Sequence, residues 1–152
     1  MLIRTHLAII VFFILLLISS VENKLVFISV ALVATFLPDI DSKFSKLGQR
    51  KIFRPLQFFV KHRGILHSFI FLFLITLFFV FFIPVVALPF FLGYSVHLFT
   101  DSFTKEGIKP FYPFKKNSSG SLKTGGKAET SVFVVFILAD LFLLVFRTFG
   151  VF

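Results

Sequence analysis

The chain has 152 residues, of which 57% are hydrophobic and 27 are phenylalanine, and its mean hydropathy is +0.99. Soluble domains are about 45–50% apolar, so this composition predicts a membrane protein. The absence of cysteine excludes disulfides, thiolate metal sites and thiol nucleophiles. A net charge of +9 is compatible with nucleic-acid binding, but the distribution of the charge argues for a lipid bilayer as the partner and against nucleic acid.

Five apolar segments follow one another along the chain. They cover residues 7–21, 25–37, 66–83, 85–100 and 131–146. A full membrane span needs roughly 20 apolar residues, with about 17 as the lower end. The third and fourth segments meet or approach this length and the fifth is close, whereas the first two predict a shallow hairpin or helices extended by flanking polar residues. We predict a single all-α domain over residues 1–152, an integral membrane bundle of about five helices with two basic cytoplasmic loops.

The basic residues orient this bundle. Of the 16 lysines and arginines, seven lie between residues 43 and 63 and six between residues 105 and 127. Alternating sides from a cytoplasmic N-terminus puts both groups and Arg4 inside, and leaves only Lys24 and Arg147 outside. The positive-inside rule therefore predicts a cytoplasmic N-terminus in the cell (inner) membrane.

The first apolar segment has a second interpretation, as a signal peptide. Arg4 precedes the apolar run and Ser19-Ser20 follows it, as in such peptides. Cleavage would remove His6, and the charge pattern requires that the first helix stays. We therefore expect the segment to be the first helix of the bundle.

Eight ionisable side chains fall at the cytoplasmic ends of these helices. They are His6, Asp39, Asp41, His62, His67, His97, Asp101 and Glu129. Scattered polar residues would divide between the two faces of the membrane. Imidazole nitrogens and carboxylate oxygens are the usual ligands of Zn²⁺ and similar cations, so this one-sided set predicts a metal site.

The first motif, Pro38-Asp39-Ile40-Asp41, follows the second apolar segment. Proline disfavours a helical conformation of the residue before it, so that helix should end near Leu37. Two aspartates separated by one residue can converge on one cation or on two neighbouring cations. The alternative is a solvated turn, because proline and aspartate are ordinary turn residues.

The second motif is His62-Arg63-Gly64-x-x-His67. Residues five apart on a helix are rotated by about 500°, so the two histidines would not share a face of one regular helix. Gly64 is predicted to mark the helix boundary, with His62 in the entering loop and His67 in the first turn. The planar guanidinium of Arg63 suits a phosphate or carboxylate. The alternative is a basic cluster that anchors the chain to lipid headgroups.

The third motif places Gly93, His97 and Asp101 four residues apart, which aligns them on one helix face. Gly93 allows a neighbouring helix to approach closely, and His97 and Asp101 can bind one metal from a single helix. The alternative is a histidine–carboxylate contact at a helix end. Ionisable residues in or near a span are functional candidates by default, so we favour the metal.

The last motif is the Gly125-Gly126-Lys127-Ala128-Glu129 segment. Its backbone N–H groups could bind an anion, and Glu129 could bind metal or act as a general base. The alternative is a polar loop feeding a helix whose first turn favours an acid. Asp140 should lie roughly 16 Å deeper than Glu129, and it has no predicted role.

These motifs resemble, in order and spacing, those of the YdjM-type inner-membrane metal-dependent hydrolases. The resemblance rests on Thr5-His6, the Pro38-Asp39-Ile40-Asp41 and His62-Arg63-Gly64-x-x-His67-Ser68 motifs and Gly93-Tyr94-x-x-His97-Leu98-x-x-Asp101, and it extends to about residue 129. It implies an inner-membrane hydrolase of undefined substrate. A more distant likeness is to zinc-dependent phospholipase C and the P1-type nucleases, in which a His-x-x-x-Asp pair looks like His97 and Asp101. The N-terminal amine ligand and the His-x-x-x-Glu pair of those enzymes have no evident counterpart, which favours one or two metals over three.

The leading hypothesis is metal-dependent hydrolysis of a phosphoester, including lipid-linked ones, at the cytoplasmic face. The metal would be one or two divalent cations, with zinc as the first candidate and manganese, iron and magnesium as alternatives. The six candidate ligands are His6, Asp39, Asp41, His67, His97 and Asp101. There are three catalytic candidates. His62 would act as a proton shuttle or a further metal ligand. Arg63, together with Lys127, would bind the anionic group of the substrate, and Glu129 would bind the metal or act as an orienting group.

Two alternatives of other classes remain. A metal carrier would place its ligands near the bilayer midplane, accessible from both sides, whereas these ligands cluster on one side. A structural bundle whose basic loops bind anionic lipid or nucleic acid would account for the charge, but it leaves the histidines unexplained.

Overall fold

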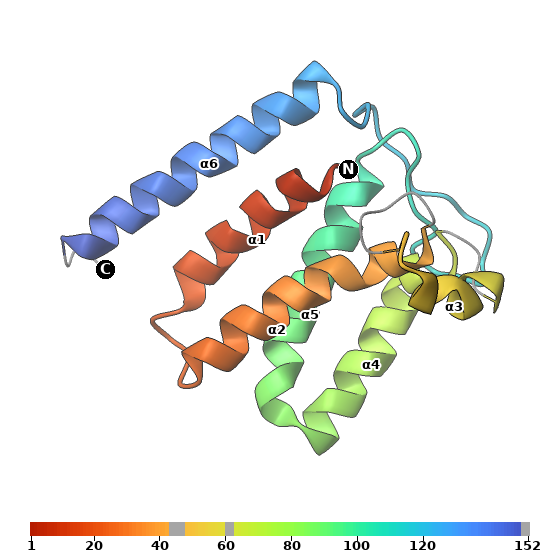
Figure 1. The fold of residues 1–152 in the computed structure, drawn as a ribbon, viewed down its shortest axis with the longest axis horizontal. Coiled ribbons are helices and arrows are strands. Elements are labelled where there is room, and N and C mark those ends of the chain that lie inside the picture. The colour runs from red at the N-terminus through yellow and green to blue at the C-terminus, as the bar shows by residue number, and fades with distance from the viewer. Residues whose placement is uncertain (43–47, 60–62, 150–152) are drawn as a thin grey trace.

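The computed structural model describes residues 1–42, 48–59 and 63–149, and this part of the chain is helical, with no strand. His62 lies outside the described residues. The α-helices are α1 (Ile3–Leu17), α2 (Lys24–Phe36), α3 (Arg54–Phe59), α4 (Phe69–Phe82), α5 (Pro84–Ser102) and α6 (Lys127–Thr148), and the 3-10 turns are η1 (Leu37–Asp41), η2 (Lys51–Phe53) and η3 (Ile65–His67). Five longer helices and the short α3 confirm the predicted all-α bundle (Figure 1).

Helix α5 lies at the centre of the bundle. It packs against α1, α2 and α4, whereas α6 lies beside α1 (Figure 1). Gly93 makes the closest of these contacts possible, because a Cβ atom added there would lie 2.1 Å from the carbonyl oxygen of Ala31 on α2. The close helix approach predicted at Gly93 is thereby confirmed.

Two apolar clusters hold the helices together. One joins α1, α2 and α5 and includes Ile10, Phe27 and Val96. The other joins α4 and α5 around Leu72 and Tyr94. Both clusters include α5, so this helix is held on several sides. The same helix carries two of the candidate ligands, His97 and Asp101.

The outer helix surfaces are apolar. Within the described residues, α5 and α6 are long and apolar enough to cross a membrane, and α1 and α4 are shorter apolar helices. Large apolar side chains point outward, including Phe81 of α4 at 73% exposure and Leu138 of α6 at 61%. Exposed apolar helix surfaces of this extent suit contact with lipid.

Several predicted helix boundaries shift. Helix α4 begins at Phe69, three residues after the predicted start, because the Ser68 hydroxyl caps it by accepting from the Ile70 N–H at 3.2 Å. His67 therefore lies in the turn η3 and not in the first turn of α4, which corrects the prediction. Helix α6 begins at Lys127, four residues before the predicted apolar segment. The predicted end of the second helix near Leu37 is confirmed.

Candidate metal centre

Three histidines from distant parts of the sequence meet at one end of the bundle. His6 comes from α1, His67 from η3 and His97 from α5, and all three side chains are completely buried. The rings of His6 and His97 are stacked with centroids 4.2 Å apart, and the His67 ring stands edge-on to His97 at 5.5 Å. The predicted convergence of the histidines on one end of the bundle is thus found in the fold.

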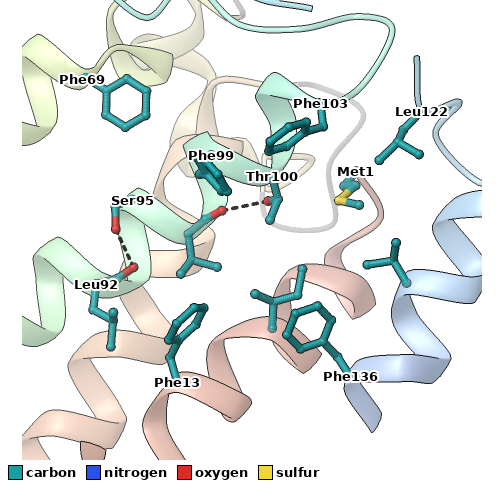
Figure 2. Close-up of a pocket in the computed structure, with 13 residues that line it drawn as sticks. Met1, Phe13, Phe69, Leu92, Ser95, Phe99, Thr100, Phe103, Leu122 and Phe136 are labelled. Carbon is teal, nitrogen blue, oxygen red and sulfur yellow. Dashed lines mark hydrogen bonds between the residues drawn. The ribbon is translucent and has the colours of Figure 1, made fainter. Parts of the chain in front are cut away.

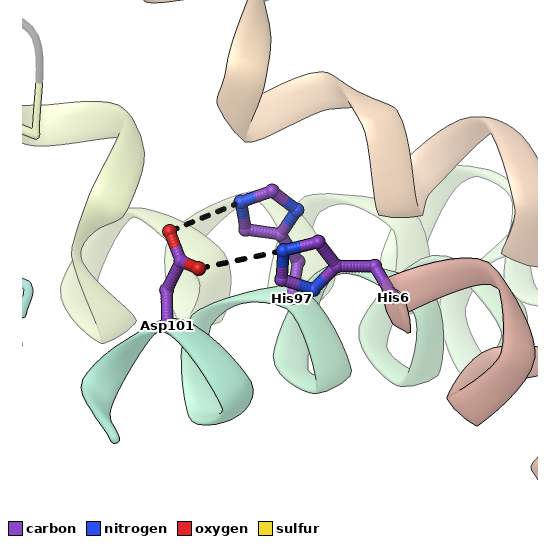
Figure 3. A group of neighbouring side chains, drawn as sticks. All are labelled: His6, His97 and Asp101. Atoms are coloured by element: carbon purple, nitrogen blue, oxygen red, sulfur yellow. Dashed lines mark ion pairs between the residues drawn. The ribbon is translucent and has the colours of Figure 1, made fainter. Parts of the chain in front are cut away.

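Asp101 lies at the centre of this group. Its Oδ1 atom is 3.4 Å from Nε2 of His6, and its Oδ2 atom is 3.8 Å from Nε2 of His97. Figure 3 shows both rings turned toward the carboxylate. The Nε2 atom of His67 is 4.0 Å from Oδ2, and the amino group of Met1 contacts Oδ1. Three imidazoles therefore direct the same nitrogen, Nε2, toward one carboxylate.

The partners of the Nδ1 atoms determine the tautomers of His97 and His67. The Nδ1 atom of His97 is 2.8 Å from the carbonyl oxygen of Thr35, and that of His67 is 3.2 Å from Oδ2 of Asp41. A carbonyl or an ionised carboxylate only accepts hydrogen bonds, so each Nδ1 carries the proton. In the neutral imidazole, Nε2 then keeps a lone pair.

Thr100 sets the tautomer of His6 in the same way. The Thr100 hydroxyl donates to the carbonyl oxygen of Val96 at 2.8 Å, so its oxygen is free to accept from Nδ1 of His6, also at 2.8 Å. Among the described residues, the buried Nε2 atoms of His6 and His97 make no hydrogen bond. An unsatisfied buried polar atom costs about 1–3 kcal/mol. A cation bound by both nitrogens would remove that cost.

The spacing of these atoms approaches that of ligands on one cation. In a tetrahedral zinc site with bonds of 2.0–2.2 Å, ligand atoms are separated by about 3.3–3.6 Å. The distance of 3.4 Å from His6 to Asp101 lies in this range, and that of 3.8 Å from His97 to Asp101 is slightly longer. His6, His97 and Asp101 form one group of candidate ligands, and Asp39, His67 and His97 form a second; within each group the ligand atoms lie within 4.8 Å of one another. Because His97 belongs to both groups, the residues could hold one divalent cation or two neighbouring ones.

The two aspartates of η1 have different positions in this arrangement. Oδ1 of Asp39 is 3.8 Å from Nε2 of His97. Burial raises the pKa of the Asp39 carboxyl above its usual range. A bound cation would favour the ionised form. Asp41 accepts from Nδ1 of His67 and from the backbone N–H of Arg63 at 3.0 Å, so in this arrangement it orients His67. Its role as a ligand stays a prediction.

Arg63 lies at the edge of the centre. Its guanidinium donates to the carbonyl oxygen of Gly107 at 2.5 Å, forms an ion pair with Glu106 at 2.8 Å and lies 3.5 Å from Oδ2 of Asp101. The backbone of Arg63 has a φ of 58°, which is uncommon for a residue other than glycine. This strained conformation places a cationic group beside the candidate ligands.

Glu129 accepts three hydrogen bonds and lies outside both groups of candidate ligands. It is 1% exposed and accepts from the N–H groups of Leu2 and Gly125, both at 2.6 Å, and from the Thr5 hydroxyl at 2.9 Å. These bonds tie the first turn of α1 to the start of α6 and so position His6. A ligating or catalytic role for Glu129 stays a prediction. Lys127 begins α6 and is exposed, and its predicted anion binding also stays a prediction.

Sequence reasoning missed the residues that hold the ligands. Thr35 and Thr100 bind the Nδ1 atoms of two histidines, and the Tyr94 hydroxyl donates to the carbonyl oxygen of Leu66 at 2.5 Å, which fixes η3. Thr100 follows His97 by three residues, which places both on the same side of α5. This spacing was the signal from which a contact of Thr100 with the site could have been predicted.

Fold and site together define a helical membrane protein with a buried histidine–aspartate centre near one end of its bundle. The chain belongs to the YdjM inner membrane protein family, whose model matches residues 1–151. Comparison with curated proteins gives no match, and comparison with solved structures gives none either. The predicted family and the membrane location are confirmed. The likeness to phospholipase C and P1-type nucleases, and the orientation in the membrane, stay predictions.

Proposed function

We propose that this protein is a metal-dependent hydrolase that acts on a phosphoester at the cytoplasmic face of the membrane. The observation that supports this most directly is the pair of buried Nε2 atoms of His6 and His97, which make no hydrogen bond to the residues that the structure describes and are directed at Asp101. His6, His97 and Asp101 would hold the first cation, and Asp39 and His67 would complete its coordination or hold a second. A nitrogen and oxygen donor set favours zinc, with manganese, iron and magnesium as alternatives.

A divalent cation in this centre supplies Lewis acidity, which polarises a phosphoryl oxygen and lowers the pKa of water. In the hydrolysis, the oxygen of water bonds to phosphorus and the bond from phosphorus to the leaving alcohol oxygen breaks. Water loses a proton and the alcohol gains one. His62, which lies outside the described residues, remains the candidate for moving that proton.

Arg63 supports a phosphorylated substrate over a neutral one. Its guanidinium lies 3.5 Å from Asp101 and its side chain is 18% exposed, so it is both next to the candidate ligands and accessible. A planar guanidinium binds two oxygens of a phosphoryl group at once. Its present acidic neighbour, Glu106, is 65% exposed, so a substrate anion could replace it at little cost.

The position of the centre favours an enzyme over a metal carrier. The candidate ligands come from the start of α1, the end of α5 and the turns η1 and η3, which all lie toward one end of the bundle (Figure 1). A carrier needs a site accessible from both membrane faces. A site at one end is accessible from one face, as a hydrolase requires.

The test is metal content together with activity. Protein purified without chelator should contain one or two divalent ions per chain and hydrolyse bis-p-nitrophenyl phosphate. His97→Ala and Asp101→Ala should each lower metal content below half an ion and activity at least a hundredfold. Glu22→Gln, an exposed carboxylate near the other end of the bundle, is the control and should change neither. Protein without divalent metal, or activity that survives both substitutions, would exclude the proposal.

A further inference from the structure

An apolar pocket lies between α5 and α6, above α1. It has a volume of about 470 Å³ and is lined by side chains from these three helices, among them Ile9, Phe13, Leu92, Phe99, Val132 and Phe136 (Figure 2). Helix α6 packs mainly on α1, which leaves this space beside α5. Its volume lies in the range of small-molecule sites, about 300–1,000 Å³.

The pocket adjoins the candidate metal centre. Thr100 and Met1 line the pocket (Figure 2), and both also contact the centre: the Thr100 hydroxyl binds His6, and the Met1 amino group contacts Asp101. A molecule whose apolar part fills the pocket would therefore have its polar end beside the metal ligands.

The surroundings of the pocket point to a lipid. The two helices that flank it, α5 and α6, are, within the described part of the chain, the two that are long and apolar enough to cross the membrane, so a hydrocarbon chain can enter from the bilayer without crossing water. Two exposed lysines lie next to the pocket along the chain. Leu122 lines the pocket, its carbonyl oxygen accepts from the backbone N–H of Lys105 at 2.8 Å, and Lys123 follows it. Exposed lysines attract anionic headgroups.

We infer that the pocket between α5 and α6 holds one hydrocarbon chain of a lipid phosphoester, and that such a membrane lipid is the substrate. This inference rests on the proposed function for its chemistry and on the pocket for the class of substrate. For a single-chain lipid phosphate such as lysophosphatidic acid, water would attack phosphorus, the bond from phosphorus to the glycerol oxygen would break, and the products would be monoacylglycerol and inorganic phosphate.

The test uses two matched substitutions on α6. Val132→Trp would fill the pocket, whereas Val135→Trp places the same bulk where the valine is 62% exposed on the outer surface. The probes are lysophosphatidic acid in phosphatidylcholine vesicles and water-soluble p-nitrophenyl phosphate. We expect Val132→Trp to lower kcat/KM for lysophosphatidic acid at least tenfold and to leave that for p-nitrophenyl phosphate within twofold of the unsubstituted protein. Val135→Trp should change neither.

A second measurement detects occupancy without hydrolysis. Lysophosphatidic acid with a diazirine in its chain, photolysed with metal-free protein in the same vesicles, should label peptides of α5 and α6 that line the pocket. Val132→Trp should lower this labelling at least fivefold. Leu92→Trp fills the same pocket from α5 and should have the same effect, which keeps the test decisive if Val132→Trp disturbs α6.

The outcomes separate the two proposals. Labelling of the pocket without hydrolysis of lysophosphatidic acid, p-nitrophenyl phosphate or bis-p-nitrophenyl phosphate would support the lipid site and contradict the proposed function. Hydrolysis of p-nitrophenyl phosphate without pocket labelling would leave the proposed function standing and overturn the lipid inference. Unchanged labelling and lipid turnover in both pocket-filling variants would likewise overturn the lipid inference. Labelled peptides found only where two copies of the chain contact each other would also overturn it and would assign the pocket to an oligomer interface.

Discussion

Each candidate histidine ligand is held by a second group through its Nδ1 atom. The carbonyl oxygen of Thr35 and the hydroxyl of Thr100 each bind an Nδ1 atom, and Asp41 does the same for His67. Each of these contacts leaves Nε2 as the nitrogen that can bind a cation. Partners of this kind fix both the tautomer and the orientation of a metal-ligating histidine.

Replacing Thr100 tests this role at one residue. Thr100→Val keeps the shape of the side chain but removes the oxygen that accepts from His6, so the imidazole loses its orientation. We expect metal affinity to fall about 10- to 100-fold, the usual effect of losing such a partner, as measured by competition with a chromophoric chelator. Thr148→Val, at an exposed position near the end of α6, is the control. Equal affinity in the two variants would contradict the assigned role of Thr100.

At the scale of elements, α5 links the site to the packing of the bundle. Gly93, His97 and Asp101 lie on one face of this helix, and Gly93 contacts α2 while Thr35 of α2 binds His97. The distance between the two helices therefore sets the geometry of the histidine. Packing and site geometry depend on the same helix pair.

Gly93→Ala should separate these helices. The added Cβ atom would lie 2.1 Å from the carbonyl oxygen of Ala31, and because that atom belongs to the backbone, a helix must move. We expect a loss of about 1–3 kcal/mol in the free energy of unfolding, as for other overpacked cores, visible as a lower Tm in detergent. Metal affinity should fall as well, because the bond from His97 to Thr35 lengthens. Ser95→Ala on the same helix is the control, and an unchanged Tm for Gly93→Ala would contradict the argument.

Local patterns predicted some elements and not others. The four-residue spacing in α5 is a local feature, so the shared face of His97 and Asp101 could be predicted. The start of α4 has a local signal that the prediction did not use, because the Ser68 hydroxyl caps the helix. The turn η3 before it depends on remote contacts: the Phe69 N–H donates to the carbonyl oxygen of Pro110, and the Tyr94 hydroxyl holds the carbonyl oxygen of Leu66. No local pattern predicts these two contacts, and they place His67 in a turn.

The same limit applies to the site. Six ligand candidates could be proposed because histidine and aspartate are rare in this apolar chain. The partners of their Nδ1 atoms could not be predicted, because the partner of His97 is a backbone carbonyl, which every residue has, and the role of the Thr100 hydroxyl depends on which helix packs beside it. Thr35 precedes His97 by 62 residues, and only the packing of α2 on α5 brings them together.

The whole molecule has two chemically different ends. The candidate metal centre lies at the end that carries Arg63 and the segment between α5 and α6, which holds five lysines, with Lys127 following as the first residue of α6. At the other end, Arg147 of α6 donates to the carbonyl oxygen of Leu15 and contacts the Ser19 hydroxyl, so its charge is bound near the end of α1. Basic segments concentrated at one end predict that this end faces the cytoplasm.

The absence of cysteine from the chain allows this orientation to be measured directly. Ser121→Cys places a thiol in the basic segment beside the metal centre, and Ser20→Cys places one in the connection between α1 and α2; both serines are exposed. In right-side-out membrane vesicles, a membrane-impermeant maleimide should label Ser20→Cys at once and Ser121→Cys only after permeabilisation, because the segment with most lysines stays on the cytoplasmic side. The unsubstituted chain, which has no thiol, gives the background. The reverse labelling pattern would place the metal centre on the outer face, and the substrate would then have to be sought outside the cytoplasm.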